Sequence, residues 1–464
     1  MSKKTIGIAV VAILLVLVAG VAPYWIGTKV ENEFRDGIAQ ARTEFGYPIE
    51  VTGYERGWLH SHAVTQLRIE DKTFDIEHDI THGPLLVFGW ARIHSTLPLD
   101  VAPKLDHFFD GPPLVADTRL GFGGGYRIDI HSPAFDKDVP DYPDAHVRWD
   151  GLEGHYARDD NQVDFQLGGG GLQIDAGDRH VLVEDIALSG SGSAMANLGN
   201  DDAALDWGSQ FEASVGNYRV YEKPGLFDIS YGMRLKANST QAEDDTVELH
   251  AGYDITDLRV KGTPSDGEPV DIDIDNAAIK LDLTGLQADP LEQLIVAMRD
   301  LDPANLSPEQ IQARTGRALI ELGPEILSGT PKLSVAIPAI DTGHGQARAL
   351  ASVGLFSPDE LPQQLKEMAR EMPLMALAQR LTLDADVFVD QQLIDWTATK
   401  LASEKPAMAR DLRTQLDALV QQGLLMREDG AVGLKLHTDV NTVVLNGRTI
   451  PAQQLKPLFD SLFQ

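Results

Sequence analysis

Histidines gather near the start of the chain and are the first residues to weigh for chemistry. Six of the 13 lie between residues 60 and 107: His60, His62, His78, His82, His94 and His107. His60 and His62 stand two positions apart, so on a strand they share a face and could supply two ligands of a metal site. No third ligand follows at a diagnostic spacing. The sequence therefore favours polar strand residues and predicts no metal site.

His82 has a different setting, because Gly83 and Pro84 follow it. Gly-Pro breaks a strand and fixes a turn. A histidine before such a turn can take part in catalysis or can bond its ring to the backbone. We favour the structural role. His82 is kept as a candidate binding residue, and no residue is assigned as catalytic.

Three carboxylates alternate with isoleucines at Asp271, Asp273 and Asp275. On one strand face they could bind calcium, or they could form a solvated face. The EF-hand loop needs glycine at its sixth position, and Asn276 stands there instead. The solvated face is the favoured interpretation.

A methionine stripe is the third candidate. Met368, Met372 and Met375 recur at near-helical spacing and could line an adaptable groove for a lipid or a partner helix. A plain core helix has the same pattern and is favoured. The three methionines are therefore candidate binding residues only.

Known catalytic motifs do not occur. The chain has no G-x-S-x-G, no Walker A sequence and no H-E-x-x-H. The glycines of Gly121–Tyr126 lack the third glycine of a dinucleotide fingerprint. No cofactor is predicted.

The elements that must position these residues begin with an apolar run, Thr5–Ile26, that contains no charged residue. About 20 apolar residues span a bilayer. Lys3 and Lys4 precede the run, which favours a cytoplasmic N-terminus, and Tyr24 and Trp25 would lie at the far interface. We expect residues 1–26 to be a single-pass anchor in a bacterial inner membrane, with the rest of the chain in the periplasm.

A cleaved signal peptide is the alternative to this anchor. The small residues Gly20, Val21 and Ala22 offer a cleavage site, but Pro23 follows at once and the apolar run is long for a signal peptide. The uncleaved anchor is favoured.

Composition agrees with a location outside the cytoplasm. The 464 residues include no cysteine, which excludes thiol chemistry and thiolate metal sites. There are 70 acidic and 39 basic residues, and the net charge of −31 argues against binding nucleic acid or anionic lipid headgroups over a broad face.

Apolar periodicity divides the remaining chain. A helical pattern over residues 28–45 predicts a stalk helix within residues 27–46. Alternation with a period of two dominates residues 47–285 and predicts a β-rich periplasmic domain. The parity of the apolar residues switches at Gly168–Gly171 and again at Asn276–Ala278, which indicates bulges or turns.

Helical and strand patterns alternate over residues 286–464, which predicts an α+β periplasmic domain. Ser307 followed by Pro308 is a helix start. The expected fold class is therefore α+β: a single N-terminal transmembrane helix, then long bent antiparallel sheets, with helices inserted in the C-terminal half.

Short motifs at both ends resemble the YdgA-like family of bacterial proteins. The first motif comprises Tyr54, Arg56, Gly57 and Ser61, followed by His82, Gly83 and Pro84, and the second comprises Asn446 and Gly447. The resemblance implies one inner-membrane anchor and a large periplasmic part. The resemblance is compatible with a homodimer, and it implies no activity.

Two functions are therefore kept. The leading hypothesis is a non-enzymatic envelope scaffold that binds a partner protein or a lipid on an apolar sheet face. The alternative is a periplasmic hydrolase or metal-dependent enzyme with a site near His60, His62 and His82. A buried polar pocket around these histidines would favour the enzyme, whereas a long apolar groove would favour the scaffold.

Overall fold

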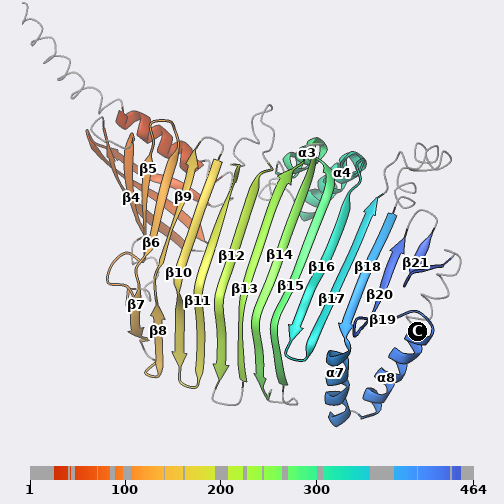
Figure 1. Cartoon of the computed structure of the whole chain (residues 1–464). Helices are drawn as coiled ribbons and strands as arrows, with labels where there is room; N and C mark the ends of the chain where they lie inside the picture. Colours follow the sequence, from red (N-terminus) through yellow and green to blue (C-terminus); the bar gives the residue numbers. More distant parts are fainter. Residues whose placement is uncertain are drawn as a thin grey trace, which may run out of the picture. The chain divides into compact units, whose positions relative to one another are not determined.

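The computed structural model of the protein describes most of the chain between residues 26 and 450. The described ranges are 26–39, 42, 48–69, 72–83, 89–97, 106–140, 142–159, 162–193, 207–222, 227–242, 245–263, 270–299, 307–355, 381–404, 406–438 and 442–450. The chain divides into two compact units, Met1–Ala203 and Ala204–Gln464. Each unit is built on antiparallel strands (Figure 1).

The first unit is a sheet that meanders from strand to strand. Its strands are β1 (Ile49–Arg56), β2 (His60–Ile69), β3 (Lys72–His82), β4 (Ala91–Leu97), β5 (Leu114–Leu120), β6 (Tyr126–Ser132), β7 (Phe135–Asp138), β8 (Ala145–Trp149), β9 (Leu152–Asp159), β10 (Gln162–Ala176) and β11 (Arg179–Ser193). Strands β1 to β6 pair in chain order. β9 then pairs with β6 and β10, β10 pairs with β11, and β7 and β8 add to the far half of β10.

A helix over residues 26–39 covers one face of the first strands. Ile26, Val30 and Phe34 recur every four residues and form a buried stripe. They pack on Ala63 of β2, Ile80 of β3, and Ala91 and Ile93 of β4. Burial of one large apolar side chain stabilises by roughly 1.5–3 kcal/mol, so this stripe holds the helix on the sheet.

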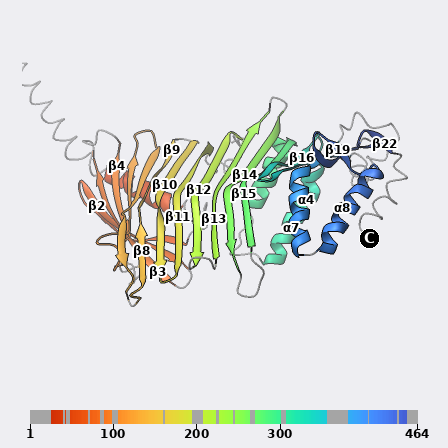
Figure 2. The same cartoon turned by 60° about the horizontal axis from the view of Figure 1, so that its bottom comes forward.

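The second unit contains long strands and two helix pairs. Its elements are β12 (Ser209–Glu222), β13 (Phe227–Gln241), β14 (Thr246–Gly262), β15 (Val270–Gln287), α3 (Ala288–Arg299), α4 (Pro308–Ile326), β16 (Lys332–Thr342), β17 (Gly345–Leu355), β18 (Leu381–Asp390), α7 (Gln391–Glu404), α8 (Pro406–Gln421), β19 (Met426–Glu428), β20 (Ala431–Thr438), β21 (Val443–Leu445) and β22 (Arg448–Ile450). Strands β12 to β18 pair in chain order, and β20 pairs with β18. Figure 2 shows β12 to β15 side by side.

The helix pairs lie at opposite ends of the strands of this unit (Figure 1). Leu294 of α3 and Ile326 of α4 form a buried cluster with Leu286 at the end of β15. The expected start of α4 is confirmed, because Ser307 and Gln310 form a capping box. At the other end, Trp396 of α7 stacks on His344 with ring centroids 4.4 Å apart.

Both predicted parity switches occur inside continuous strands. β10 pairs with β9 up to Gly169 and with β8 from Leu172 onward. Gly171 between these halves has a φ of 151°, which lets the strand change partner without ending. In β15, the register to β16 shifts between Ala277 and Lys280, as a β-bulge does.

The expected fold class is wrong and needs correction. In the part of the chain that the structure describes, both units are predominantly antiparallel sheet and not α+β: one helix covers a sheet face in the first unit, and helices lie at strand ends in the second. Strands of up to 18 residues carry the architecture because strict alternation runs through them. No helix in the described part of the chain is long and apolar enough to cross a bilayer. Residues 5–25 of the expected anchor lie outside the described residues.

The boundary expected after residue 285 rested on a change of pattern. The first helix of the second unit, α3, begins three residues later at Ala288. The division into compact units, in contrast, falls between Ala203 and Ala204. The boundary at residue 285 stays a prediction.

Candidate functional site

Helix 26–39 buries His82 against Ser61. The His82 Nε2 atom lies 3.0 Å from the Ser61 Oγ atom, and the two residues are only 1% and 6% exposed. A serine beside a histidine is the start of a nucleophile and base pair. However, the Nδ1 atom of His82 is buried and has no hydrogen-bond partner among the described residues. The Cα atom of Gly27 lies against the ring, since a Cβ atom there would come within 2.7 Å of Cε1.

Burial also sets the protonation of this cluster. It lowers the pKa of His82, and the nearby charges of His60 and Arg56 lower that pKa further. A neutral, enclosed pair with no access for a substrate is a structural contact. The geometry therefore makes Ser61 and His82 part of the sheet surface on which the helix over residues 26–39 packs. We call this surface the helix seat.

His78 is the second buried histidine under the helix. Its Nε2 lies 2.8 Å from the Thr65 hydroxyl and its Nδ1 2.7 Å from the Ser95 hydroxyl. Phe34 of the helix packs edge-on against the ring at 5.1 Å. Burial lowers the pKa of His78 to about 4, with a further contribution from His62. The ring is therefore neutral, with one nitrogen donating and the other accepting.

The family-like motif near the N-terminus coincides with this helix seat. Arg56 donates from Nη1 to the Thr28 hydroxyl of the helix at 2.9 Å. The ring of Tyr54 lies 6.0 Å from that of Phe34, and burial raises the pKa of Tyr54 although Ser61 opposes that rise.

Two glycines of the motif allow the turns beside the seat. A Cβ atom on Gly57 would meet the His60 carbonyl oxygen at 2.1 Å, and Gly83 has a φ of 140°. Pro84 lies outside the described residues.

The C-terminal motif joins a hairpin to a helix end. Asn446 and Gly447 turn between β21 and β22 with φ values of 51° and 76°. The side chain of Asn446 accepts a hydrogen bond from the Lys435 amide and donates one to the Gly423 carbonyl, both at 2.9 Å. Asn446 thus ties β20 to the residues after α8.

His60 and His62 lie on the opposite face of the sheet from His82. Strand neighbours alternate between faces, so Ser61 points to the helix while His60 and His62 point away. His60 contacts the Thr81 hydroxyl and His62 contacts Asp79, each at 3.2 Å. The three histidines of the hydrolase hypothesis therefore do not converge on one site.

This second face carries a row of histidines and carboxylates that crosses nine strands. Its members lie directly opposite one another on neighbouring strands: Glu55, His62, Asp79, His94, Asp117, Asp129, His155, Gln166 and Ser189. We call it the first polar row. Partial burial raises the pKa of Asp117, but hydrogen bonds from His94 and Arg92 outweigh burial and leave that pKa below its ordinary value.

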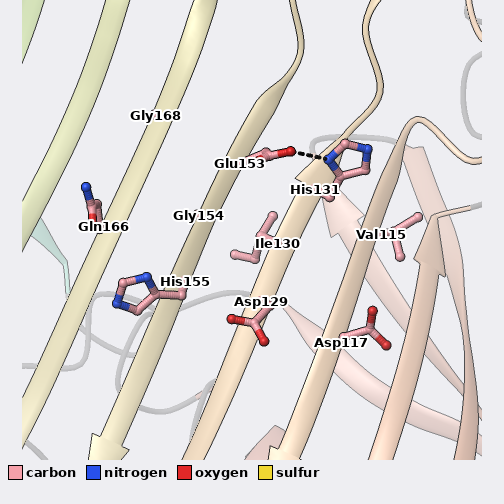
Figure 3. A pocket seen from close by; sticks show the side chains of 10 residues that line it. All are labelled: Val115, Asp117, Asp129, Ile130, His131, Glu153, Gly154, His155, Gln166 and Gly168. Atoms are coloured by element: carbon pink, nitrogen blue, oxygen red, sulfur yellow. Dashed lines mark ion pairs between the residues drawn. The ribbon is translucent and has the colours of Figure 1, made fainter.

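A shallow pocket of about 580 Å³ lies over this row (Figure 3). Its side chains stand apart on neighbouring strands, and the ion pair between His131 and Glu153, at 3.6 Å, is the one drawn there. In the part of the chain that the structure describes, no group of three possible ligands could hold a metal ion. The pocket wall is about half polar and half apolar, and its lining residues form no convergent catalytic set.

A second polar row crosses the second unit. It consists of Gln210, Asn238, His250, Asp282, Ser334, Ser352, Asp384 and His437. A 2.6 Å hydrogen bond to Asp282 raises the pKa of His250. Cross-strand pairs of opposite charge each contribute roughly 0.2–1 kcal/mol, so pairs such as His250 and Asp282 help to fix strand register.

The aspartates of the calcium hypothesis lie on exposed strand positions near cations. Asp273 lies 3.6 Å from Arg259, and Asp271 lies 4.0 Å from Lys261. They therefore form a solvated, charge-paired strand face. Met368, Met372 and Met375 lie outside the described residues.

The opposite face of the second unit is apolar. One row crosses eight strands without a polar side chain: Phe211, Ala237, Ala251, Leu281, Val335, Ala351, Ala385 and Leu436. We call this face, with its neighbouring parallel rows, the apolar face.

Many large side chains of the apolar face are exposed. They include Met233, Leu235, Ile279, Leu281, Leu333, Val335, Val353 and Val387. Helices α3 and α4 cover only one end of the face, where Leu249 and Leu283 pack against them. Monomeric proteins rarely expose contiguous apolar patches above a few hundred Å², and larger ones mark binding surfaces. The apolar face is therefore the candidate functional site.

Sequence reasoning expected an apolar sheet face but named none of its residues. The signal was present as alternation in the separate strands, for example Leu333, Val335 and Ile337. Only the strand register aligns such residues into rows.

Comparison with known proteins gives the family. The chain matches no curated protein and no solved structure. A family model does match, over residues 1–453, and this match does not confirm the YdgA-like name. The chain belongs to the family described as bacterial protein of unknown function, DUF945.

Proposed function

We propose that the protein binds lipid acyl chains on the apolar face of its second unit and acts as a non-enzymatic lipid-binding scaffold of the cell envelope. The observation that carries this proposal is the row from Phe211 to Leu436, which crosses eight paired strands with no hydrogen-bonding side chain. A hydrocarbon chain needs no polar partner, so such a row suits it.

Dimensions support a chain-like ligand. Neighbouring strands lie about 4.8 Å apart, so eight strands make a row roughly 34 Å long. The hydrocarbon core of a bilayer is about 30 Å thick and holds two opposed layers of acyl chains. One acyl chain would thus cover about half of the row.

Side-chain types favour lipid over a protein partner. Cores of protein interfaces are enriched in tyrosine, tryptophan, phenylalanine, methionine and arginine. The apolar face is mostly leucine, isoleucine, valine and alanine; its exceptions include Phe211, Met233 and Tyr253, and the serines Ser209 and Ser239 at one end of the neighbouring row. Aliphatic surfaces of this kind give little directional recognition, which fits chains of variable length.

The test compares two matched variants of the full chain. Leu281→Glu places a charge in the middle of the apolar face. Leu350→Glu is the control, because Leu350 is exposed to a similar extent (45% against 42%) but lies on the other face of the same sheet. Each protein is purified in mild detergent, its phospholipid is quantified, and binding of a fluorescent phospholipid is measured.

We expect the wild type and Leu350→Glu to carry phospholipid and Leu281→Glu to lose most of it. Because all three proteins keep residues 1–26, lipid held there cancels in the comparison. Equal phospholipid in both variants would refute the proposal. The proposal would also be refuted if a second copy of the chain or another protein, and not lipid, were found bound to the apolar face.

A further inference from the structure

Large aromatic side chains gather at one end of the strands of the first unit. Trp58 in the β1–β2 turn and Phe122 in the β5–β6 turn are 57% and 55% exposed. Trp90 lies between these turns, at the start of β4. We call Trp58, Trp90 and Phe122 the aromatic patch.

Contacts between the turns hold the patch together. The indole of Trp90 donates a hydrogen bond to the Phe122 carbonyl at 3.3 Å, and the two rings meet edge-on at 5.2 Å. The His82 amide donates to the Leu59 carbonyl beside Trp58 at 2.9 Å.

A glycine makes the closest of these approaches possible. A Cβ atom on Gly89 would come within 1.8 Å of the Leu120 carbonyl oxygen, so only glycine lets the two turns pack this closely. The patch is therefore a built surface and not a set of separate loops.

The first described residues of the helix over residues 26–39 lie at this same end. Gly27 lies against His82, and the Lys29 ammonium sits 4.8 Å from the centre of the Trp90 ring. The chain before Ile26 is the uncharged run that starts at Thr5. An apolar segment is thus joined to the protein directly beside exposed aromatic rings.

A row of positively charged side chains lies next to the aromatic patch, further along the strands. Arg92, Arg119 and Arg127 stand opposite one another on β4, β5 and β6. They pair with Asp117 and Asp129, so three guanidinium groups face two carboxylates. This excess of cations is local, since the whole chain carries a net charge of −31.

We propose that the aromatic patch rests on the interfacial region of a lipid bilayer. Tryptophan is enriched at that depth because its ring is apolar and its N–H is polar. The neighbouring cations suit anionic headgroups. This proposal does not depend on lipid binding by the second unit.

Photo-crosslinking of the full chain tests the proposal. A benzophenone amino acid replaces Trp58, Phe122 or Tyr142, and each protein is placed in vesicles of phosphatidylethanolamine and phosphatidylglycerol. Tyr142 is the control, because it is 67% exposed but lies in the β7–β8 turn, beside the far half of β10. Thermal melting confirms that each variant is folded. Two positions in the patch are used so that the test still stands if one of the two variants does not fold.

We expect the yield of lipid adducts at positions 58 and 122 to exceed that at position 142 several-fold. Equal yields at all three positions would overturn the proposal, because contact would then be non-specific. Adducts between two copies of the chain at positions 58 and 122 would also overturn it.

Discussion

Gly27 shows how one missing side chain seats a helix. Its Cα lies against the buried ring of His82, and a Cβ atom would come within 2.7 Å of that ring. His82 cannot withdraw, because it is enclosed and bonded to Ser61. The closeness of helix and sheet therefore depends on this glycine.

We predict that Gly27→Ala lowers the free energy of unfolding by about 1–2 kcal/mol, because the cost of overpacking exceeds the gain in helix propensity. Gly37→Ala is the control, since nothing lies within 4 Å of a Cβ atom there, and it should add about 0.5–1 kcal/mol. Urea unfolding of the full chain measures both. A stabilising Gly27→Ala would contradict the described helix seat.

His78 makes the first unit sensitive to acid. Its pKa is lowered by burial from 6.5 to about 4, so below pH 6.5 the unfolded chain takes up a proton that the folded chain does not. The stabilising contribution is complete above pH 6.5 and is lost as the pH falls toward 4. It amounts to at most about 3 kcal/mol.

We predict that His78→Gln flattens the fall in stability between pH 7 and pH 4.5. Glutamine can still bond to Thr65 and Ser95 but takes up no proton. Urea unfolding at both pH values gives the two differences in free energy. The same difference in wild type and variant would show that His78 does not carry the acid sensitivity.

At the scale of elements, α3 and α4 act as a cover for one end of the apolar face. Leu294 is buried between the helices and Leu286, whereas Ile320 of α4 is exposed. We predict that Leu294→Ala costs about 2–4 kcal/mol through the cavity it leaves. Ile320→Ala should change stability by no more than about 0.5 kcal/mol. Thermal melting of both variants checks this, and similar melting temperatures would argue against the packed cover.

Several elements could be predicted from local pattern alone. The capping signal at Ser307 marked α4, and the alternation over residues 47–285 marked the strands of that range. The switch of parity at Gly168–Gly171 pointed to a hairpin or a bulge, but β10 runs straight through it. The apolar pattern within a segment shows which side chains share a sheet face. Whether the chain turns back at a switch of faces depends on which strands pair there, and the pattern does not show that.

At the scale of the molecule, the expected location can now be tested without reference to the fold. We predict that a reporter fused after Gln464 is active only outside the cytoplasm, because we expect the apolar run Thr5–Ile26 to direct export. Leu14→Arg combined with Leu17→Arg interrupts that run and should abolish the activity. Equal reporter activity with and without these charges would contradict export through this segment.

The candidate site could be predicted in kind but not in its residues. Alternation indicated one apolar and one wet face for each sheet. The rows that define these faces join distant residues, as in the contact of His437 with Asp384, which lie 53 positions apart. No local pattern encodes such a register, because it is set by the lengths of turns and by bulges along the whole meander.

The order of strand pairing in the second unit has a consequence for how the chain reaches this structure. From β12 to β18, each strand pairs with the one made just before it. Contact order between strands is therefore low, and the sheet can grow by one strand at a time during synthesis. Every intermediate of that growth ends in an unpaired strand beside a widening apolar surface, which is the form most prone to aggregation. The next strand must therefore become available to pair before the exposed apolar surface of such an intermediate meets that of another chain.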